Sequence, residues 1–293
     1  MRLVAIPSWS FARERSLLNL VREILSHPKI ELHGVDHDLD WNRTVTAFSG
    51  EAEVVADMVM RLAIATFETI DLGRHIGVYP RIGALDDCPL VIQKPEKKRR
   101  ESQVMEALTV AENLAGLLSA TFELPIFLEE KSDRGRHEGE IASLRMGGFA
   151  GLQGRKLHPD FGPSVAHPRW GVTTLGVRDF FIAIALNFET EDVGTPETLA
   201  RQIEQMREEG DSRMLGVRAM GLALPTRGIV QLNLNLMLPD LTAVDPIIEF
   251  VRREVRRVDV KVASTQLIGP LRDIDLPEAT RIKIEQARVI STS

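Results

Sequence analysis

The sequence predicts an α/β fold of the α+β sandwich type, with two related subdomains that each pack helices on a mixed β-sheet. Short apolar runs rich in β-branched residues alternate along the chain with amphipathic helical patterns, which is typical of this class. The element order β-α-β-β-α-β occurs in both halves, and in the second half it is the ferredoxin-like order. We therefore expect residues 1–178 and 179–293 to form the two subdomains.

The first half shows its clearest patterns before residue 129. Strands are predicted over residues 3–7, 30–35, 43–48, 90–93 and 125–128. Helices with apolar residues spaced by three and four are predicted over 12–26 and 51–71, with Ser10 or a neighbour as the first cap. A third helix is predicted to follow a charged entry at 94–100 and to run to about residue 120.

Residues 129–176 show no clear periodicity. They contain nine Gly and three His, and only one short helix is predicted, over 139–145. Phe149, Phe161 and Trp170 argue against disorder, because disordered segments are poor in aromatic residues. A long segment without periodicity that is still ordered usually has a function.

The second half returns to regular patterns. Strands are predicted over 180–188, 215–222, 229–237 and 258–263. Helices are predicted over 195–209, 242–257 and 278–289. Thr195 followed by Pro196 is a typical helix start, and Gly210 is a typical stop.

Composition limits the class of protein. The chain has 293 residues, 44% of them hydrophobic, which suits one large domain or two smaller ones with their own cores. Its net charge of −6 argues against a generally basic, nucleic-acid-binding surface. The longest apolar run, 180–186, is far short of the roughly 20 residues of a membrane helix, and the N-terminal apolar run is too short for a signal peptide. With Cys88 as its single cysteine, we expect a soluble cytoplasmic protein that binds neither nucleic acid nor membrane.

The densest group of reactive side chains lies in residues 75–89, between a predicted helix and a predicted strand. Two Gly and two Pro prevent regular structure over its full length. The segment carries His75, Tyr79, Arg81 and two Asp, and Arg74 directly precedes it. Such a loop is either a functional site or an ordinary connection, and composition alone leaves both open.

The stretch GRHIGVYPRIGALDDCPL, residues 73–90, resembles the loop R-H-x-G-x-H-P-R-x-G-A-x-D-x-x-P of the formiminotransferase family. Other segments are similar to family motifs as well. They are Val35-Asp36 with Asn42-Arg43-Thr44-Val45, the run PDFGPS at 159–164, Trp170-Gly171, Gly176 with Arg178 and 180–187, and TQLIG at 265–269. The resemblance therefore covers most of the chain.

This resemblance implies a reaction, a co-substrate and an assembly. Family members move a formimino group from N-formimino-L-glutamate to N5 of tetrahydrofolate, which is held in an electropositive tunnel between two α/β subdomains. They form homodimers, which we expect here too. The cyclodeaminase domain that vertebrate members add is expected to be absent, since the sequence ends at Ser293.

The resemblance implies catalytic roles for Tyr79, Asp36 and His75. Tyr79 stands where the family has its catalytic His, and Asp36 aligns with the Asp near that His. Histidine changes protonation near neutral pH, whereas a free tyrosine hydroxyl ionises only near pH 10. Tyr79 is therefore a poor base unless nearby cations such as Arg81 and Arg74 assist it, or His75 takes over the proton transfer.

The resemblance also implies a set of residues that bind folate or the glutamate donor. Asn42 and Arg43 are candidates for holding a carboxylate, because arginine pairs well with carboxylates; the alternative is a capping pair in a turn. The full set is Asn42, Arg43, Arg74, Arg81, Gly83, Asp160, Gly162, Pro163 and Ser164.

Other histidines carry weaker signals. Asp36-His37-Asp38 looks like a set of metal ligands, but alternate residues of a strand point to opposite faces, so we expect no metal site. His137, His158 and His167 lie in the irregular segment, where the family places substrate contacts, and are either ligand contacts or structural.

Three functions stay open at this point. The chain is an active one-carbon transferase, with formimino- or formyl-glutamate as donor, or a folate-binding protein without catalysis, or an interaction protein that kept only the fold. A 5-formyltetrahydrofolate formyltransferase variant belongs to the first class.

Overall fold

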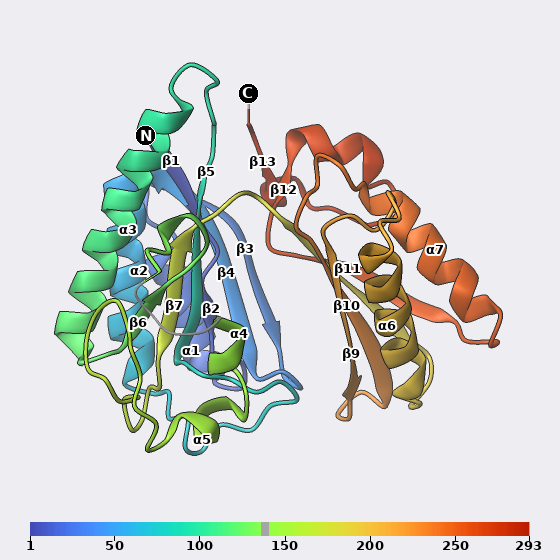
Figure 1. Cartoon of the computed structure of the whole chain (residues 1–293), viewed down its shortest axis with the longest axis horizontal. Helices are drawn as coiled ribbons and strands as arrows, with labels where there is room; N and C mark the ends of the chain where they lie inside the picture. Colours follow the sequence, from blue (N-terminus) through green and yellow to red (C-terminus); the bar gives the residue numbers. More distant parts are fainter. Residues whose placement is uncertain (136–140, 293) are drawn as a thin grey trace. The chain divides into compact units, whose positions relative to one another are not determined.

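The computed structural model describes residues 1–135 and 141–292, so His137 lies outside the described residues. The chain forms two compact units, Met1–Arg178 and Asp179–Thr292 (Figure 1). Each unit packs helices on a β-sheet, which confirms the predicted fold class.

The first unit is built on a seven-stranded mixed sheet. Strand β3 lies beside β4, β1 and β2 lie in turn between β4 and β5, and β7 and β6 complete the sheet. Strand β7 runs parallel to both β5 and β6, whereas the other pairs are antiparallel. The strands are β1 (Arg2–Ala5), β2 (Ser8–Trp9), β3 (Ile30–Asp38), β4 (Arg43–Glu51), β5 (Leu85–Ile92), β6 (Ile126–Leu128) and β7 (Thr173–Val177).

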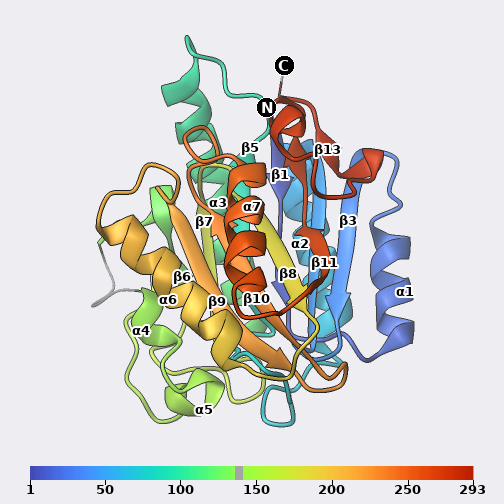
Figure 2. The same cartoon turned by 90° about the vertical axis from the view of Figure 1, so that its right-hand side faces the viewer.

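Three helices cover one face of this sheet (Figures 1 and 2). They are α1 (Arg15–Ile24), α2 (Ala52–Phe67) and α3 (Arg100–Phe122). In α2 the apolar residues recur every three or four positions and are at most 1% exposed, as an amphipathic helix requires; they are Val55, Met58, Val59, Leu62 and Ala63. They share one core with Leu3, Trp9, Phe48 and Leu90 of the strands.

The irregular segment after β6 adds a second, smaller core. Its short helices are η1 (Glu130–Ser132), α4 (Ile141–Leu144) and α5 (Gly148–Leu152). Leu144, Leu152 and Val172 of this segment pack with Ile82 and Phe127, so its described part is ordered, as predicted. Strand β7 at its end was not predicted.

The second unit is a four-stranded antiparallel sheet with two helices, in the order β11-β8-β10-β9. This order confirms the ferredoxin-like prediction. The first unit repeats it, since β5, β1 with β2, β4 and β3 follow the same order, so the two units share one topology. The elements are β8 (Ile182–Phe188), α6 (Gly194–Glu208), β9 (Val217–Leu224), β10 (Ile229–Leu236), α7 (Val244–Arg256) and β11 (Val262–Ile268).

The predicted helix over 278–289 is wrong. The chain instead forms β12 (Leu271–Arg272), the 3-10 turns η2 (Asp273–Glu278) and η3 (Gln286–Arg288), and β13 (Val289–Ile290), which runs parallel to β12. Asp245 of α7 accepts hydrogen bonds from the backbone N–H groups of Thr280 and Arg281. These bonds tie the segment to α7, and the pairing of Val289 and Ile290 with β12 places its end in a strand rather than a helix.

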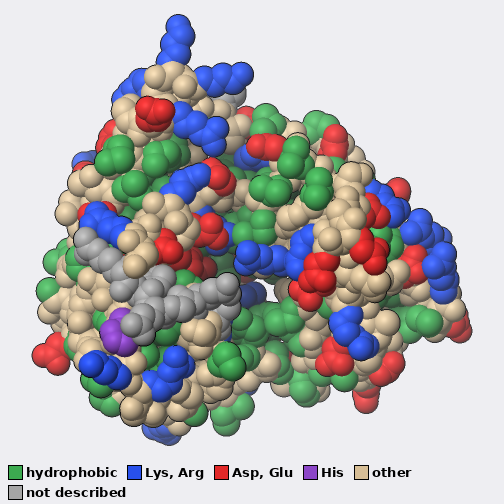
Figure 3. Space-filling model, in the orientation of Figure 1, with side chains coloured by type: hydrophobic (Ala, Val, Ile, Leu, Met, Phe, Trp, Pro, Cys, Tyr) green, Lys and Arg blue, Asp and Glu red, His purple; other side chains and the backbone are tan. Residues whose placement is uncertain are grey.

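Charged side chains of both signs are interspersed over the face of the molecule shown in Figure 3, in keeping with the modest net charge of −6. Within the described ranges, no helix has both the length and the apolar character that a membrane span requires.

Candidate functional site

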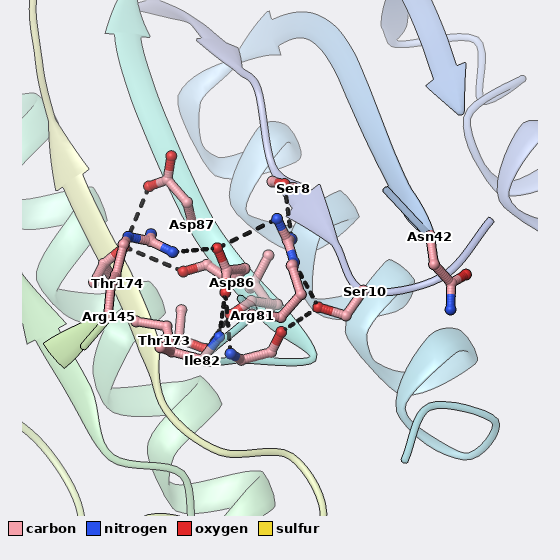
Figure 4. A network of polar contacts seen from close by, with 12 residues as sticks. Ser8, Ser10, Asn42, Arg81, Ile82, Asp86, Asp87, Arg145, Thr173 and Thr174 are labelled. Atoms are coloured by element: carbon pink, nitrogen blue, oxygen red, sulfur yellow. Dashed lines mark hydrogen bonds and ion pairs between the residues drawn. The ribbon is translucent and has the colours of Figure 1, made fainter. Parts of the chain in front are cut away.

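Arg81 is the buried centre of the predicted loop. Arg81 is 4% exposed, and burial lowers the pKa of its guanidinium. The Nε–H group donates to Ser10 Oγ at 3.0 Å, and Nη2 donates to Ser8 Oγ at 2.9 Å (Figure 4). Ser10 is thus not a helix cap; its hydroxyl donates to the carbonyl of Gly83 at 2.5 Å. Strand β2 and the loop before β5 together fix the orientation of this cation.

Asp86 lies at the start of β5 and joins two arginines. Its Oδ2 is 3.4 Å from Arg81 Nη1 and 2.6 Å from Arg145 Nη1, and Figure 4 shows the three side chains pointing toward one another. Its Oδ1 accepts from the backbone N–H groups of Ile82 at 2.7 Å and Gly83 at 3.1 Å. The Asp86 carboxylate therefore holds the loop closed through two backbone N–H groups and lies between two guanidinium groups. We call Arg81, Asp86 and Arg145 the arginine cluster.

The charges in the arginine cluster are mutually stabilised. Burial alone would raise the pKa of Asp86, but Arg81, Arg145 and the Ile82 N–H bond outweigh it and hold that pKa below its usual value. Burial opposes the charge of Arg145, yet Asp86 and the other nearby acidic groups raise its pKa. All three side chains are therefore charged at neutral pH.

Gly83 must be glycine at its position beside this cluster. A Cβ there would lie 2.0 Å from the carbonyl oxygen of Val172 and 2.5 Å from that of Leu85. Gly83 thus lets the loop approach the strands closely, and its predicted contact with a ligand stays a prediction.

Asn42 anchors the turn between β3 and β4. Its φ of 46° is in the left-handed region, which asparagine tolerates better than most residues. Its Oδ1 accepts from Ala12 N–H at 2.9 Å, and its carbonyl bonds His75 Nε2 at 2.9 Å. Asn42 therefore has a structural role in the turn. It also joins the predicted loop to the β3–β4 turn.

Trp41, Tyr79 and Arg43 form a stack beside this turn. The rings of Trp41 and Tyr79 have centroids 5.4 Å apart, and the Arg43 guanidinium carbon lies 4.2 Å from the Trp41 centroid. Burial, together with the charge of Arg81, lowers the pKa of Arg43 to about 10. Arg43 therefore stays protonated at neutral pH, and stacking on its face leaves the N–H groups at its rim directed sideways.

His75 is held as a neutral imidazole. Burial lowers its pKa, and this effect outweighs the bond to the Asn42 carbonyl. In the neutral ring, the nitrogen that faces a carbonyl must carry the hydrogen, so Nε2–H donates to Asn42 and Nδ1 keeps its lone pair.

This burial predicts a stability change with pH. The unfolded chain protonates His75 near pH 6.5, whereas the folded chain does so only at lower pH, so stability is lost as the pH falls below about 6.5. We expect His75→Gln to lose less stability than the wild type between pH 7 and pH 5. Urea midpoints followed by tryptophan fluorescence measure this, with the exposed His37→Gln as control. Equal losses in wild type and His75→Gln would contradict it.

Asp36 belongs to a row that crosses the sheet on the face opposite the three helices. Asp36 of β3 lies opposite Val45, Val45 opposite Ser8, Ser8 opposite Asp87, and Asp87 opposite Thr174. Residues directly opposite in a sheet share a face. Three strand spacings separate Asp36 from Asp87, which is about 14 Å between backbones. We call these five residues the cross-sheet row.

The other predicted residues have mainly structural contacts. Asp160 Oδ2 accepts from Leu128 N–H at 2.7 Å, and a Cβ on Gly162, at φ 89°, would lie 2.4 Å from the Leu124 carbonyl. Pro163 is half-buried, and the carbonyl of the exposed Ser164 accepts from Leu157 N–H. Arg74 is exposed on the surface of the loop. The predicted ligand contacts of these five residues stay predictions.

Neither described histidine of the irregular segment joins the arginine cluster through a described contact. His167 stacks on Trp170 at 4.2 Å and its Nδ1 accepts from two backbone N–H groups, while His158 is exposed. In the described part of the chain, no three His, Cys, Asp or Glu side chains gather as metal ligands would.

Several residues of the site were missed by sequence reasoning. Arg145 reaches Asp86 from a segment with no clear pattern, 59 positions along the chain. Ser8 and Trp41 look like ordinary strand and loop residues, and Ser10 looks like a helix cap. Cys88, which follows Asp87 on β5, is fully buried in the core, and burial raises the pKa of its thiol well above the usual value.

Comparison with known proteins decides the family. The model of the formiminotransferase domain, N-terminal subdomain, matches residues 2–178. This chain belongs to the formiminotransferase family. The match covers the whole first unit, with its arginine cluster and the Asn42 turn.

Relatives of this formiminotransferase-family chain align over most of its length. It is 28% identical over 274 residues to the formimidoyltransferase-cyclodeaminase of Sus scrofa, covering 90% of this chain and 49% of that protein. It is 28% identical over 269 residues to the glutamate formimidoyltransferase of Streptococcus pyogenes serotype M1, covering 87% of that protein. The enzyme of the same name from Thermoplasma acidophilum is 26% identical over 271 residues. The chain thus spans about half the length of the cyclodeaminase relative.

Proposed function

We propose that this chain transfers the formimino group of N-formimino-L-glutamate to N5 of tetrahydrofolate. Family membership and the names of its relatives, glutamate formimidoyltransferase among them, support this activity. The observation that carries the proposal is the convergence of two motif segments at one place. The Asn42–Arg43 turn and the His75–Arg81 loop meet through the His75–Asn42 bond and the Trp41–Tyr79 stack.

The reaction exchanges one amine for another at an amidine carbon. The N5 nitrogen of tetrahydrofolate attacks that carbon, a tetrahedral intermediate forms, and the bond to the glutamate nitrogen breaks. N5 loses one proton and the glutamate nitrogen gains one. The site must therefore bind two carboxylate-bearing molecules, accept a proton and donate a proton.

Arg43 is the proposed anchor for a substrate carboxylate. Its guanidinium face rests on Trp41, so the donors at its rim can form two parallel bonds to one carboxylate. The half-buried ring of Tyr79, which packs against the buried Trp41, offers an aromatic surface for the flat pterin ring of tetrahydrofolate. Arg81 is committed to Ser8, Ser10 and Asp86, so we assign it to shaping the loop rather than to binding the donor.

Asp36 is the proposed acceptor of the N5 proton, since a carboxylate accepts a proton from an amine that becomes cationic during attack. The Tyr79 hydroxyl, which the sequence resemblance aligns with the family's His, is the proposed hydrogen-bond donor to the amidine nitrogen. A hydroxyl can stabilise the charge that develops there without ionising itself. His75 orients the loop through Asn42. A group that gives the departing nitrogen its proton is still required.

We further propose that the chain acts in the cytoplasm as a homodimer. The lone cysteine favours a reducing compartment, and the family resemblance favours the dimer. Sedimentation velocity of the purified chain tests the assembly.

Turnover assays test the proposed function. We expect tetrahydrofolate-dependent release of glutamate from N-formimino-L-glutamate, and no more than a trace from N-formyl-L-glutamate. Faster turnover of the formyl donor would support a formyltransferase instead. Folate binding without turnover of either donor would indicate a folate-binding protein, and absence of binding would indicate another use of the fold.

A further inference from the structure

A tight turn at residues 167–171, which the proposed mechanism does not use, takes its shape from one imidazole ring. The backbone N–H groups of Arg169 and Trp170 both donate to Nδ1 of His167, at 3.2 Å and 3.0 Å. The backbones of His167 and Gly171 bond each other in both directions at 2.9 Å. The His167 ring is also stacked on the Trp170 indole. We call residues 167–171 the His167 turn.

The His167 turn is fixed to the end of α2. The indole Nε1–H of Trp170 donates to the Phe67 carbonyl at 2.8 Å, and Nε–H of Arg169 donates to the Ile70 carbonyl at 3.0 Å. Phe67 is the last residue of α2, and its carbonyl has no acceptor role within the helix, so the indole satisfies it. The turn is therefore anchored to the core of the first unit.

The same turn holds both ends of residues 73–83, the segment that carries the predicted catalytic side chains. Directly before that segment, Leu72 N–H donates to the Arg169 carbonyl at 2.9 Å. Directly after it, Ala84 N–H donates to the Trp170 carbonyl at 2.9 Å. Arg169 and Trp170 are the two residues whose own N–H groups bond the imidazole. The positions of both segment ends thus depend on the shape that the ring gives the turn.

Gly171 brings the His167 turn into direct contact with the segment itself. Its φ is 70°, and a Cβ there would lie 1.9 Å from the Ile82 carbonyl oxygen. Val172 N–H donates to that same carbonyl at 2.9 Å. Because Ile82 directly follows Arg81, the contact adjoins the arginine cluster.

The two hydrogen bonds to His167 require a neutral ring. Nδ1 accepts them only while it has a lone pair, so the hydrogen of the neutral imidazole must be on Nε2. A proton added at Nδ1 replaces the acceptor by a donor that faces two N–H groups. Burial lowers the pKa of His167; Glu123, at the end of α3, opposes this effect, and Arg169 adds to it. The ring is half-buried, so protons from solvent reach it when the turn opens.

We propose that His167 is a positioning residue that holds residues 73–83 only in its neutral form, and that protonation of its ring releases both ends of this segment. The link to turnover rests on the proposed function, whereas the release does not. The open turn protonates like a free histidine, near pH 6.5, and the closed turn only at lower pH. The closed turn is therefore fully favoured above about pH 6.5 and is lost as the pH falls.

Amide hydrogen exchange of Leu72 and Ala84, followed by NMR of the isotope-labelled protein, measures this release without turnover. Protection factors correct each rate for the intrinsic effect of pH. In the wild type, both factors should fall together and several-fold between pH 7 and pH 5, by at most about tenfold per pH unit, the limit for one proton. The exposed His37→Gln should show the same fall.

Two variants at position 167 separate the Nδ1 bonds from the rest of the ring. His167→Asn places an amide oxygen where Nδ1 lies, and asparagine before a proline favours such a turn. This variant keeps both bonds and does not titrate, so its protection should stay constant between pH 7 and pH 5. His167→Gln places its polar group one bond further out, so the protection of Leu72 and Ala84 should be low at both pH values.

The outcomes that contradict the inference are distinct. Wild-type protection that is constant between pH 7 and pH 5 would overturn it, and so would a fall that persists in His167→Asn. His75 lies in the same segment and also titrates, so a fall that is absent from His75→Gln would assign the effect to His75 and overturn the inference, even if His167→Asn fails to fold. A fall that persists in His75→Gln supports His167.

Activity separates this inference from the proposed function. If formimino transfer needs the held segment, His167→Asn should lose less of its kcat/KM between pH 7.5 and pH 5.5 than the wild type does. An active wild type with constant protection would overturn the inference alone. A wild type whose protection falls with pH but that turns over neither donor would overturn the proposed function and leave the role of His167 in the turn intact.

Discussion

Asp86→Ala should destabilise the first unit by about 3–5 kcal/mol, the cost of removing one partner from a buried ion pair. The substitution leaves Arg81 and Arg145 facing each other without their common anion. It also leaves the N–H groups of Ile82 and Gly83 without their acceptor. Urea unfolding measures the loss conveniently, because Trp9, Trp41 and Trp170, the three tryptophans of the chain, all belong to the first unit.

A matched control separates burial from charge. Asp57→Ala removes an ion pair of 2.8 Å with Arg61 on the exposed side of α2, and should cost less than about 1 kcal/mol. Asp86→Asn keeps an oxygen for the two N–H groups but removes the charge, so its loss should lie between those of Asp57→Ala and Asp86→Ala. If Asp86→Ala unfolds at the same urea concentration as Asp57→Ala, the arginine cluster does not stabilise the loop.

Tyr79→Phe should lower kcat by about 100-fold, the usual cost of losing one hydrogen-bond donor to developing charge. The phenyl ring keeps the stack on Trp41, so binding of tetrahydrofolate should change little. A fall in kcat with a nearly constant dissociation constant for tetrahydrofolate is the expected signature, measured by steady-state kinetics and equilibrium fluorescence.

Tyr79→His tests the same position by introducing a proton carrier instead of removing a hydroxyl. A histidine carries a proton near neutral pH, so this variant should turn over at least as fast as the wild type. The exposed Leu39→Ala, in the β3–β4 turn, is the control and should behave like the wild type. Undiminished turnover of Tyr79→Phe would remove the hydroxyl from the mechanism.

The fold followed from the sequence where periodic patterns are long. The helices α2 and α3 and the strands β3, β4, β8 and β10 were predicted with shifts of a few residues at their ends. Strand β5 was predicted to start at residue 90 but begins at Leu85, because pairing with β2 and β7 overrides the low strand propensity of Asp86, Asp87 and Pro89. The terminal helix was wrongly predicted because Val289 and Ile290 pair with β12, a tertiary contact that local periodicity does not contain.

The site was only partly predictable for a related reason. The motif contained Arg81 and Gly83 of the loop and Asn42 of the turn, and the structure brings those segments together. Arg145 and Ser8 come from segments that no local pattern joins to the loop. Their roles depend on strand register and on a long-range ion pair, which spacing along the chain does not contain.

Cys88 gives the site a natural chemical reporter. Its thiol is the single one in the chain, follows Asp87 on β5 and is fully buried, with a raised pKa. A small uncharged alkylating reagent can reach it only when the strand beneath the site opens, so the labelling rate of the native protein measures that opening free energy. A ligand bound on the other face of β5 should slow labelling in proportion to its occupancy, which allows substrates to be ranked by mass spectrometry without any turnover.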